Sequence, residues 1–187
     1  MKYAVFLVII ISIAASVLFM MGRTPFCACG YIQFWSGDIW SNENSQQLSD
    51  PYSFTHFLHG IGAYGLLHVV ARSFPLSIGT RLIIAVGGEA SFEVIENTDI
   101  VINRYREETL SLNYYGDSVL NSVSDIIIFA LGFLFASRMS RRTSIIVFIL
   151  TEIALMIWIR DSLMINMIML IYPIEAIKLW QLRGFGV

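Results

Sequence analysis

The chain has 187 residues, of which 56% are hydrophobic and only 14% are charged, and its mean hydropathy is +0.68. Soluble domains carry about 25% charged residues, so this composition excludes an ordinary soluble domain and is typical of a membrane protein. The formal net charge of −2 and the lack of a basic patch with interleaved aromatic residues exclude a nucleic-acid-binding surface.

Six apolar segments approach the roughly 20 residues that a helix needs to cross a bilayer. In chain order, the predicted transmembrane helices cover residues 3–21, 54–71, 78–97, 117–136, 144–159 and 163–180. The first segment resembles a signal sequence, but no A-x-A cleavage site follows it, so we expect it to be retained; its removal would leave five helices. We therefore expect an all-α polytopic bundle of about six helices that forms one integral membrane domain over residues 1–187.

The distribution of Lys and Arg predicts the orientation of this bundle. With the N-terminus in the cytoplasm, eight of the twelve basic residues lie on the cytoplasmic side, and the run SRMSRR contributes most. This favours a bacterial inner-membrane protein with both termini cytoplasmic and two long outer loops, 22–53 and 98–116. The first loop contains Cys27 and Cys29, whose spacing allows either a small-ring disulfide or two free thiols.

Polar side chains share single faces of three predicted helices. Glu89, Glu93 and Glu96 in the run EASFEVIEN follow helical spacing, and three ionised carboxylates on one face must share protons, pair with cations or bind a metal. The run GDSVLNSVSD places its polar residues four apart, and FTHFLHG places two histidines three apart. The residues on these two faces are Asp117, Asn121, Asp125, His56 and His59.

In the predicted topology, all three polar faces reach the outer half of the membrane, where ionisable groups mark a functional site by default. The candidate catalytic residues are Glu93, Glu96, Asp117, Asn121 and Asp125, with Asn121 as an orienting group. The candidate metal ligands are His56, His59 and Glu89. A divalent metal is therefore the candidate cofactor, because imidazole and carboxylate together suit zinc or iron. Asn166, in the last predicted helix, is expected to close another wall of the cavity.

Other interpretations remain open. The two histidines can simply bond a neighbouring helix, and the carboxylates can pair with arginines. The leading hypothesis is a hydrolase or transferase that acts on a lipid or lipid-linked substrate. The alternatives are a proton or cation carrier and a non-catalytic membrane assembly module.

Two arginines favour a phosphate-bearing lipid as the substrate. Arg104 and Arg106 flank a tyrosine in the outer loop just above the glutamate face, and the planar arginine fork recognises phosphate through two hydrogen bonds. Ordinary pairing with Glu107 and Glu108 is the alternative explanation for their presence.

Several long runs carry a family resemblance. They are GRTPFCACGYIQFW, SNENSQQLSDPYSFTHFLHG, EASFEVIENTDIVINRYREETLSLNYYGDSVLNSVSD and IRDSLMINMIMLIYPIEAIKLWQ. With these runs the chain resembles a bacterial membrane-protein family known only as the domain of unknown function numbered 2585, over nearly its whole length. The resemblance implies a multi-pass inner-membrane protein and supplies no catalytic assignment. A fainter likeness, in spacing alone, is to the VanZ-type membrane proteins.

Overall fold

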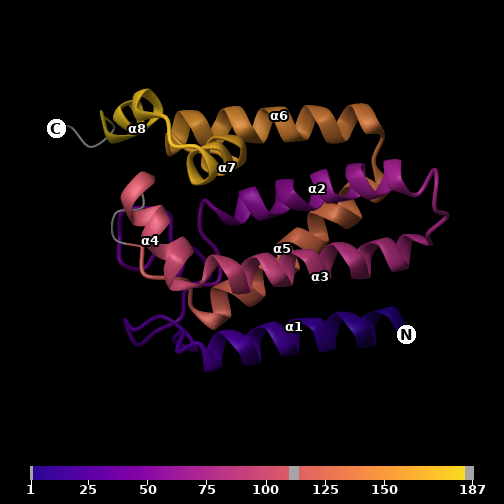
Figure 1. The fold of residues 1–187 in the computed structure, drawn as a ribbon, viewed down its shortest axis with the longest axis horizontal. Helices are drawn as coiled ribbons and strands as arrows, with labels where there is room; N and C mark the ends of the chain where they lie inside the picture. Colours follow the sequence, from indigo (N-terminus) through magenta and orange to yellow (C-terminus); the bar gives the residue numbers. More distant parts are fainter. Residues whose placement is uncertain (1, 110–113, 184–187) are drawn as a thin grey trace.

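The computed structural model describes residues 2–109 and 114–183, and all the regular structure in these residues is helical. Five helices are 18 to 20 residues long: α1 (Lys2–Met20), α2 (Ser53–Val70), α3 (Ile78–Glu96), α5 (Val119–Arg138) and α6 (Arg141–Trp158). Three are short: α4 (Asp99–Glu108), α7 (Leu163–Ile171) and α8 (Glu175–Leu182). The long helices lie roughly lengthwise in a bundle, and the short ones gather at one end of it (Figure 1).

Serine side chains start four of the helices. Ser77, Ser118, Ser140 and Ser162 each accept a hydrogen bond from the backbone N–H three residues further on. This contact satisfies one of the donors that a helix N-terminus leaves unpaired. Ser77 and Ser140 lie in the two runs, SFPLSIG and SRMSRRTS, that contain the tight connections between long helices.

The closest helix contact joins α2 to α5, and two glycines make it possible. A Cβ atom on Gly60 would overlap the backbone carbonyl oxygen of Phe129, and one on Gly132 would overlap that of Phe57. Small residues let helix backbones approach closely. Both helices start at the same end of the bundle (Figure 1), and the first turn of α2 lies against the second turn of α5, where Ser53 donates to Asp125.

An apolar core fills the bundle away from the short helices. Its buried members come from α1, α3 and α5 and are Ala14, Leu82, Ala85, Val86, Ala90, Ile126, Phe129 and Phe133. A second cluster joins α2, α5 and α7 through Leu58, Ile61, Ala136 and Leu163. By length and composition, α1 and α5 are apolar enough to cross a membrane, and α6 with α7 gives a third candidate if this pair, bent by 73°, is one broken span.

The prediction of one continuous helix over 163–180 is wrong. The chain leaves α7 after Ile171 because Pro173 follows, and the residue before a proline is disfavoured in helical conformation. Glu152 of α6 fixes the bend before α7 by accepting hydrogen bonds from the backbone N–H groups of Leu163 (2.9 Å) and Met164 (3.1 Å). The predicted outer loop 98–116 contains a further helix, α4.

This difference changes the position of the C-terminal segment. The start of α1 and the helix α8 lie at opposite ends of the bundle (Figure 1). The structure therefore does not provide the sixth lengthwise crossing on which the expectation of two cytoplasmic termini depended.

The glycine contact predicts a clear stability difference. Gly60→Ala and Gly132→Ala should each lower the free energy of unfolding by about 1–3 kcal/mol, because the added methyl group has to displace backbone. Gly62→Ala is the matched control, since a Cβ there meets no atom within 4 Å. Thermal unfolding in detergent measures the difference, and equal midpoints for Gly60→Ala and Gly62→Ala would contradict the close crossing.

Candidate functional site

Three long helices bring polar side chains to one cavity at the end of the bundle. The first two turns of α2 and α5 and the end of α3 line it together with residues of α4 and α7, and Figure 1 shows these segments at the same end of the bundle. The cavity has a volume of about 50 Å³, which is room for water molecules or an ion. Its polar lining includes His56, His59, Glu96, Tyr105, Tyr114, Asp117, Asn121, Asp125 and Asn166.

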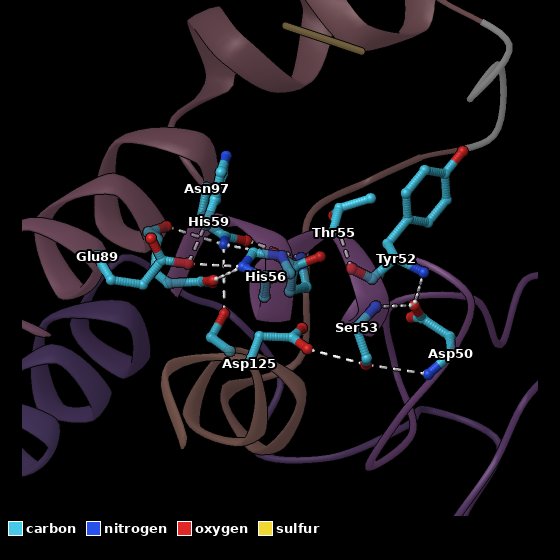
Figure 2. A network of polar contacts seen from close by, with 12 residues as sticks. Asp50, Tyr52, Ser53, Thr55, His56, His59, Glu89, Asn97 and Asp125 are labelled. Carbon is cyan, nitrogen blue, oxygen red and sulfur yellow. Dashed lines mark hydrogen bonds and ion pairs between the residues drawn. The ribbon is translucent and has the colours of Figure 1, made fainter. Parts of the chain in front are cut away.

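His56 is at the centre of the charged groups. Its Nδ1 lies 2.7 Å from Oε1 of Glu89 and 3.3 Å from Oε1 of Glu93, both of which are buried glutamates of α3. The Nδ1 of His59, one turn further along α2, lies 3.6 Å from the same oxygen of Glu89. Figure 2 shows His56, His59 and Glu89 facing one another across the α2–α3 contact. The two helical faces predicted from spacing therefore meet.

Glu93 has an unusual environment. It is 0% exposed, and neither of its carboxylate oxygens accepts a hydrogen bond. Nδ1 of His56 lies 3.3 Å from Oε1 of Glu93, and the same nitrogen hydrogen-bonds to Glu89. A buried ionised carboxylate without hydrogen bonds costs several kcal/mol, so this position requires a proton or a cation.

Asp117 lies just before α5 and is held by α3. Asn97 donates to its Oδ2 (2.8 Å) and Tyr114 to its Oδ1 (3.0 Å), while the Asp117 backbone N–H donates to Asn97 (2.7 Å). Burial raises the pKa of Asp117 to about 6, and the hydrogen bonds from Asn97 and Tyr114 oppose that rise. Gly116 allows the approach, because its φ of +95° is a conformation that side chains disfavour.

Asp125 connects the cavity to the loop before α2. Its Oδ1 accepts a hydrogen bond from Ser53 Oγ (2.9 Å), which in turn accepts one from the backbone N–H of Asp50 (3.2 Å). The Asp50 carboxylate accepts from the backbone N–H groups of Ser45, Tyr52 and Ser53. Figure 2 shows Asp125 between this group and the histidines. Asp50 thereby fixes the start of α2, and the hydrogen bond from Ser53 holds Asp125 against this first turn.

Two other predicted catalytic residues have different surroundings. Asn121 lines the cavity, but its side-chain amide donates to the backbone oxygen of Gln47 (3.0 Å) and so also anchors the loop that covers the site. Glu96 lines the cavity beside Tyr105 of α4, whose hydroxyl donates to Asn166 of α7 (3.2 Å). The short helices thus close the cavity through Tyr105 and Asn166.

The two predicted headgroup arginines do not line the cavity. Arg104 donates to the backbone oxygen of Leu170 (3.1 Å) and pairs with Glu108 (3.6 Å), so it holds α4 on α7. Arg106 is exposed on the outer face of α4. Headgroup binding by these residues stays a prediction.

Two overlapping groups of side chains offer ligand atoms within 4.8 Å of one another and could hold a metal ion. The first is the predicted set of His56, His59 and Glu89, and the second contains His56, Glu93 and Glu96. A third group, formed by Cys27, Cys29 and Glu43, is not a ligand set because the two cysteines form a disulfide. This disulfide is one of the two states that the sequence allowed.

Sequence reasoning missed four residues that build the site: Asp50, Asn97, Tyr105 and Tyr114. Asn97 had a usable signal, because it continues the i, i+4 spacing of Glu89 and Glu93. Asp50 lies three residues before α2, in a position typical of a side chain that binds the first N–H groups of a helix. The two tyrosines had no such signal, since they reach the cavity only through the fold of the segment around α4.

The raised pKa of Asp117 predicts how stability depends on pH. The folded state holds this proton more tightly than the unfolded state, so the stability contributed is present below pH 3.8 and is lost as pH rises to about 6. The unfolding midpoint of the wild type minus that of Asp117→Asn should therefore fall over this range. Asp99→Asn is the control, because the Asp99 side chain is 90% exposed; a difference for Asp117→Asn as flat as the control would contradict the assignment.

Comparison with known proteins identifies the family of this chain. The family profile described as a protein of unknown function, DUF2585, matches residues 18–183. A UPF0314 protein of Paracoccus denitrificans is 47% identical over 96% of this chain and 91% of its own length, and one of Rhizobium johnstonii is 44% identical over 95% and 89%. No solved structure matches, and the likeness to VanZ-type proteins finds no support in these matches. The chain belongs to the uncharacterised DUF2585 (UPF0314) family.

Proposed function

We propose that this protein is a membrane-embedded hydrolase or transferase that acts on a lipid or lipid-linked substrate at the outer face of the bacterial inner membrane. The observation that carries the proposal is the convergence of two imidazoles and several buried carboxylates on one cavity at the helix ends. Ionisable groups at membrane depth cost free energy, and by default they mark a functional site.

The lengths and surfaces of the long helices support membrane embedding. Helices of 18 to 20 residues span about 27–30 Å, which matches the hydrocarbon core of a bilayer. Large apolar side chains are exposed along α1 and α6. They include Val8, Ile13, Phe19, Ile146, Leu150 and Ile157. We propose that α1, α2, α3, α5 and α6 cross the membrane and that these side chains face lipid.

The disulfide supports an outward position for the site. With α7 and α8 at the site end, the twelve basic residues divide six and six between the two ends, so their distribution no longer selects an orientation. The Cys27–Cys29 disulfide lies in the loop at the site end, and disulfides persist in the periplasm rather than the cytosol. Trp35 and Trp158 stack at the same end, where aromatic rings suit the interface.

The chemistry divides among the side chains of the cavity. Asp117 and Asp125 line it as candidate acid and base, and Glu96 faces it from α3. A cavity of about 50 Å³ admits a reacting group and a water molecule but not a whole headgroup. The remainder of a lipid would therefore stay outside, where Arg106 of α4 is an exposed arginine that could bind a phosphate.

The carrier hypothesis has weaker support. Transport needs a polar route through the other half of the bundle, and the core that α1, α3 and α5 bury there is apolar. The polar cluster is confined to the end at which α2 and α5 begin, which suits a reaction at one membrane face.

A lipid-turnover assay tests the proposed function. Wild-type protein and Asp125→Asn are reconstituted into vesicles of total bacterial lipid, and the lipid species are compared by mass spectrometry. The wild type should deplete at least one lipid species, and Asp125→Asn should slow that change by about 100-fold or more, as loss of an acid or base group does. Asp99→Asn is the control at an exposed carboxylate. No wild-type turnover, or full activity of folded Asp125→Asn, would refute the role.

A reporter fusion tests the orientation separately. Alkaline phosphatase fused after the last residue should be active, because α8 lies at the same end as the disulfide loop. A fusion within the 71–77 connection, at the opposite end, should be inactive. The reverse pattern would place the site in the cytoplasm, and two inactive fusions would restore the six-crossing arrangement.

A further inference from the structure

The charges around the cavity do not balance. Five carboxylates gather there, from Glu89, Glu93, Glu96, Asp117 and Asp125, against the two imidazoles of His56 and His59. Within residues 2–109 and 114–183, no Lys or Arg forms an ion pair with any of the five. Protons on some carboxylates and charge on the imidazoles can reduce the excess, but a divalent cation would neutralise it most directly.

Unsatisfied atoms locate the place where such a cation would bind. Three buried side-chain atoms of the cluster have no hydrogen-bond partner: Nδ1 of His59 and both oxygens of Glu93. The Glu93 side chain is only 1% exposed, so water in the bulk does not reach these oxygens. Oε1 of Glu93 lies near Nδ1 of His56, and Nδ1 of His59 lies near Oε1 of Glu89, so the unsatisfied atoms flank the hydrogen-bonded pair of His56 and Glu89.

The distances in this group resemble those between the ligands of a metal ion. Bonds of about 2.1 Å to nitrogen and oxygen place neighbouring ligand atoms about 3.0–3.4 Å apart in octahedral or tetrahedral sites. The separations are 2.7 Å between His56 Nδ1 and Glu89 Oε1, 3.3 Å between His56 Nδ1 and Glu93 Oε1, and 3.6 Å between His59 Nδ1 and Glu89 Oε1. His59 and Glu93 belong to two triads of possible ligands that share His56, so binding of one ion by both requires these side chains to move towards it.

We propose that His56, His59, Glu89 and Glu93 bind one divalent transition-metal ion of the zinc type. Two ligands come from one turn of α2 and two from one turn of α3, an arrangement that helical bundles use for metal sites. Binding through His56 Nδ1 requires this nitrogen to give up the proton that it shares with Glu89, either to the other ring nitrogen or to solvent. The proposal deepens the proposed function because it names the cofactor of the same cavity, and it leaves Asp117 and Asp125 free to act on water or substrate.

The set differs from the one expected from sequence. His56, His59 and Glu89 were the expected ligands, with Glu93 as a catalytic group, whereas the unpartnered oxygens of Glu93 assign it to the ion. Imidazole and carboxylate donors suit zinc, iron or manganese better than magnesium or calcium, which prefer oxygen alone.

Metal titration of the full-length protein in detergent tests the proposal. Chelator-treated wild type is titrated with Zn²⁺, and bound zinc is measured by mass spectrometry after gel filtration. We expect one ion per chain, a higher unfolding temperature with Zn²⁺, and little effect of Mg²⁺. His59→Ala and Glu93→Gln should weaken binding by more than the roughly 10- to 100-fold that loss of a group outside the ligand set costs.

Matched variants separate ligand loss from damage to the fold. His68→Ala changes a histidine at the other end of α2, and Glu152→Gln changes a buried glutamate that caps α7; both should bind zinc as the wild type does. Without metal, Glu93→Gln should be at least as stable as the wild type, because it removes a buried carboxylate that lacks hydrogen bonds. With saturating Zn²⁺ this order should reverse.

Two results would overturn the proposal: no zinc bound by the wild type when it is offered, or wild-type affinity in folded Glu93→Gln. The proposed enzyme would survive either result if chelated wild type still converted lipid and Asp125→Asn did not. Zinc binding without lipid turnover would support the metal site and refute the proposed enzymatic activity.

Discussion

The close crossing of α2 and α5 is the constraint on which the rest of the structure depends. Gly60 and Gly132 let the two backbones meet without intervening side chains, and the contact fixes the first turns of both helices at the same end of the bundle. His56 lies on the first turn of α2 and Asp125 on the second turn of α5. α3 packs against both helices, so its last two turns bring the glutamates to the same place. The position of every charged group in the cavity therefore follows from how closely two helices approach.

Burying these charged groups together costs free energy. The hydrogen bonds that hold the site are made by residues around the cluster rather than by the clustered side chains themselves. Asp50 and Ser53 hold the start of α2, Asn97 holds Asp117, and Tyr105 closes the cavity from α4. These contacts fix the neighbours of the cluster while the oxygens of Glu93 remain without hydrogen bonds. A purely structural network would be expected to satisfy its own buried groups, so the unsatisfied atoms favour a bound cation over simple helix packing.

Much of the site could be predicted from sequence, because helical periodicity assigns residues to faces. The spacing of Glu89 and Glu93, of His56 and His59, and of Asp117 and Asp125 each implied one polar face, and these faces do meet. Periodicity does not state which helices are neighbours, so their meeting depended on the glycine contact. The role of Asn121 as a loop anchor could not be predicted, because it depends on how residues 21–52 fold. This long segment has no regular helix, and hydropathy gives no information on its path.

Hydropathy predicted the wrong helix where an apolar segment of the chain is not one continuous helix. Residues 163–180 are apolar enough for a span, but Pro173 divides them, and Glu152 turns α7 back towards the site. The C-terminal segment consequently supplies Asn166 to the cavity wall, as expected, yet by a different path. α4 was missed because a ten-residue polar helix gives no membrane signal, although it covers the cavity with Tyr105.

The metal site proposed between α2 and α3 binds its ion through nitrogen and oxygen atoms. X-ray absorption at the zinc edge, on protein loaded with one equivalent of Zn²⁺, tests this most directly because it reports the atoms around the ion. We expect a first shell of nitrogen and oxygen at about 2.0–2.1 Å, with the outer-shell scattering of two imidazoles. A first shell containing sulfur would place the ion at Cys27 and Cys29, and a shell without imidazole scattering would show that the histidines do not bind it; either spectrum would contradict the account.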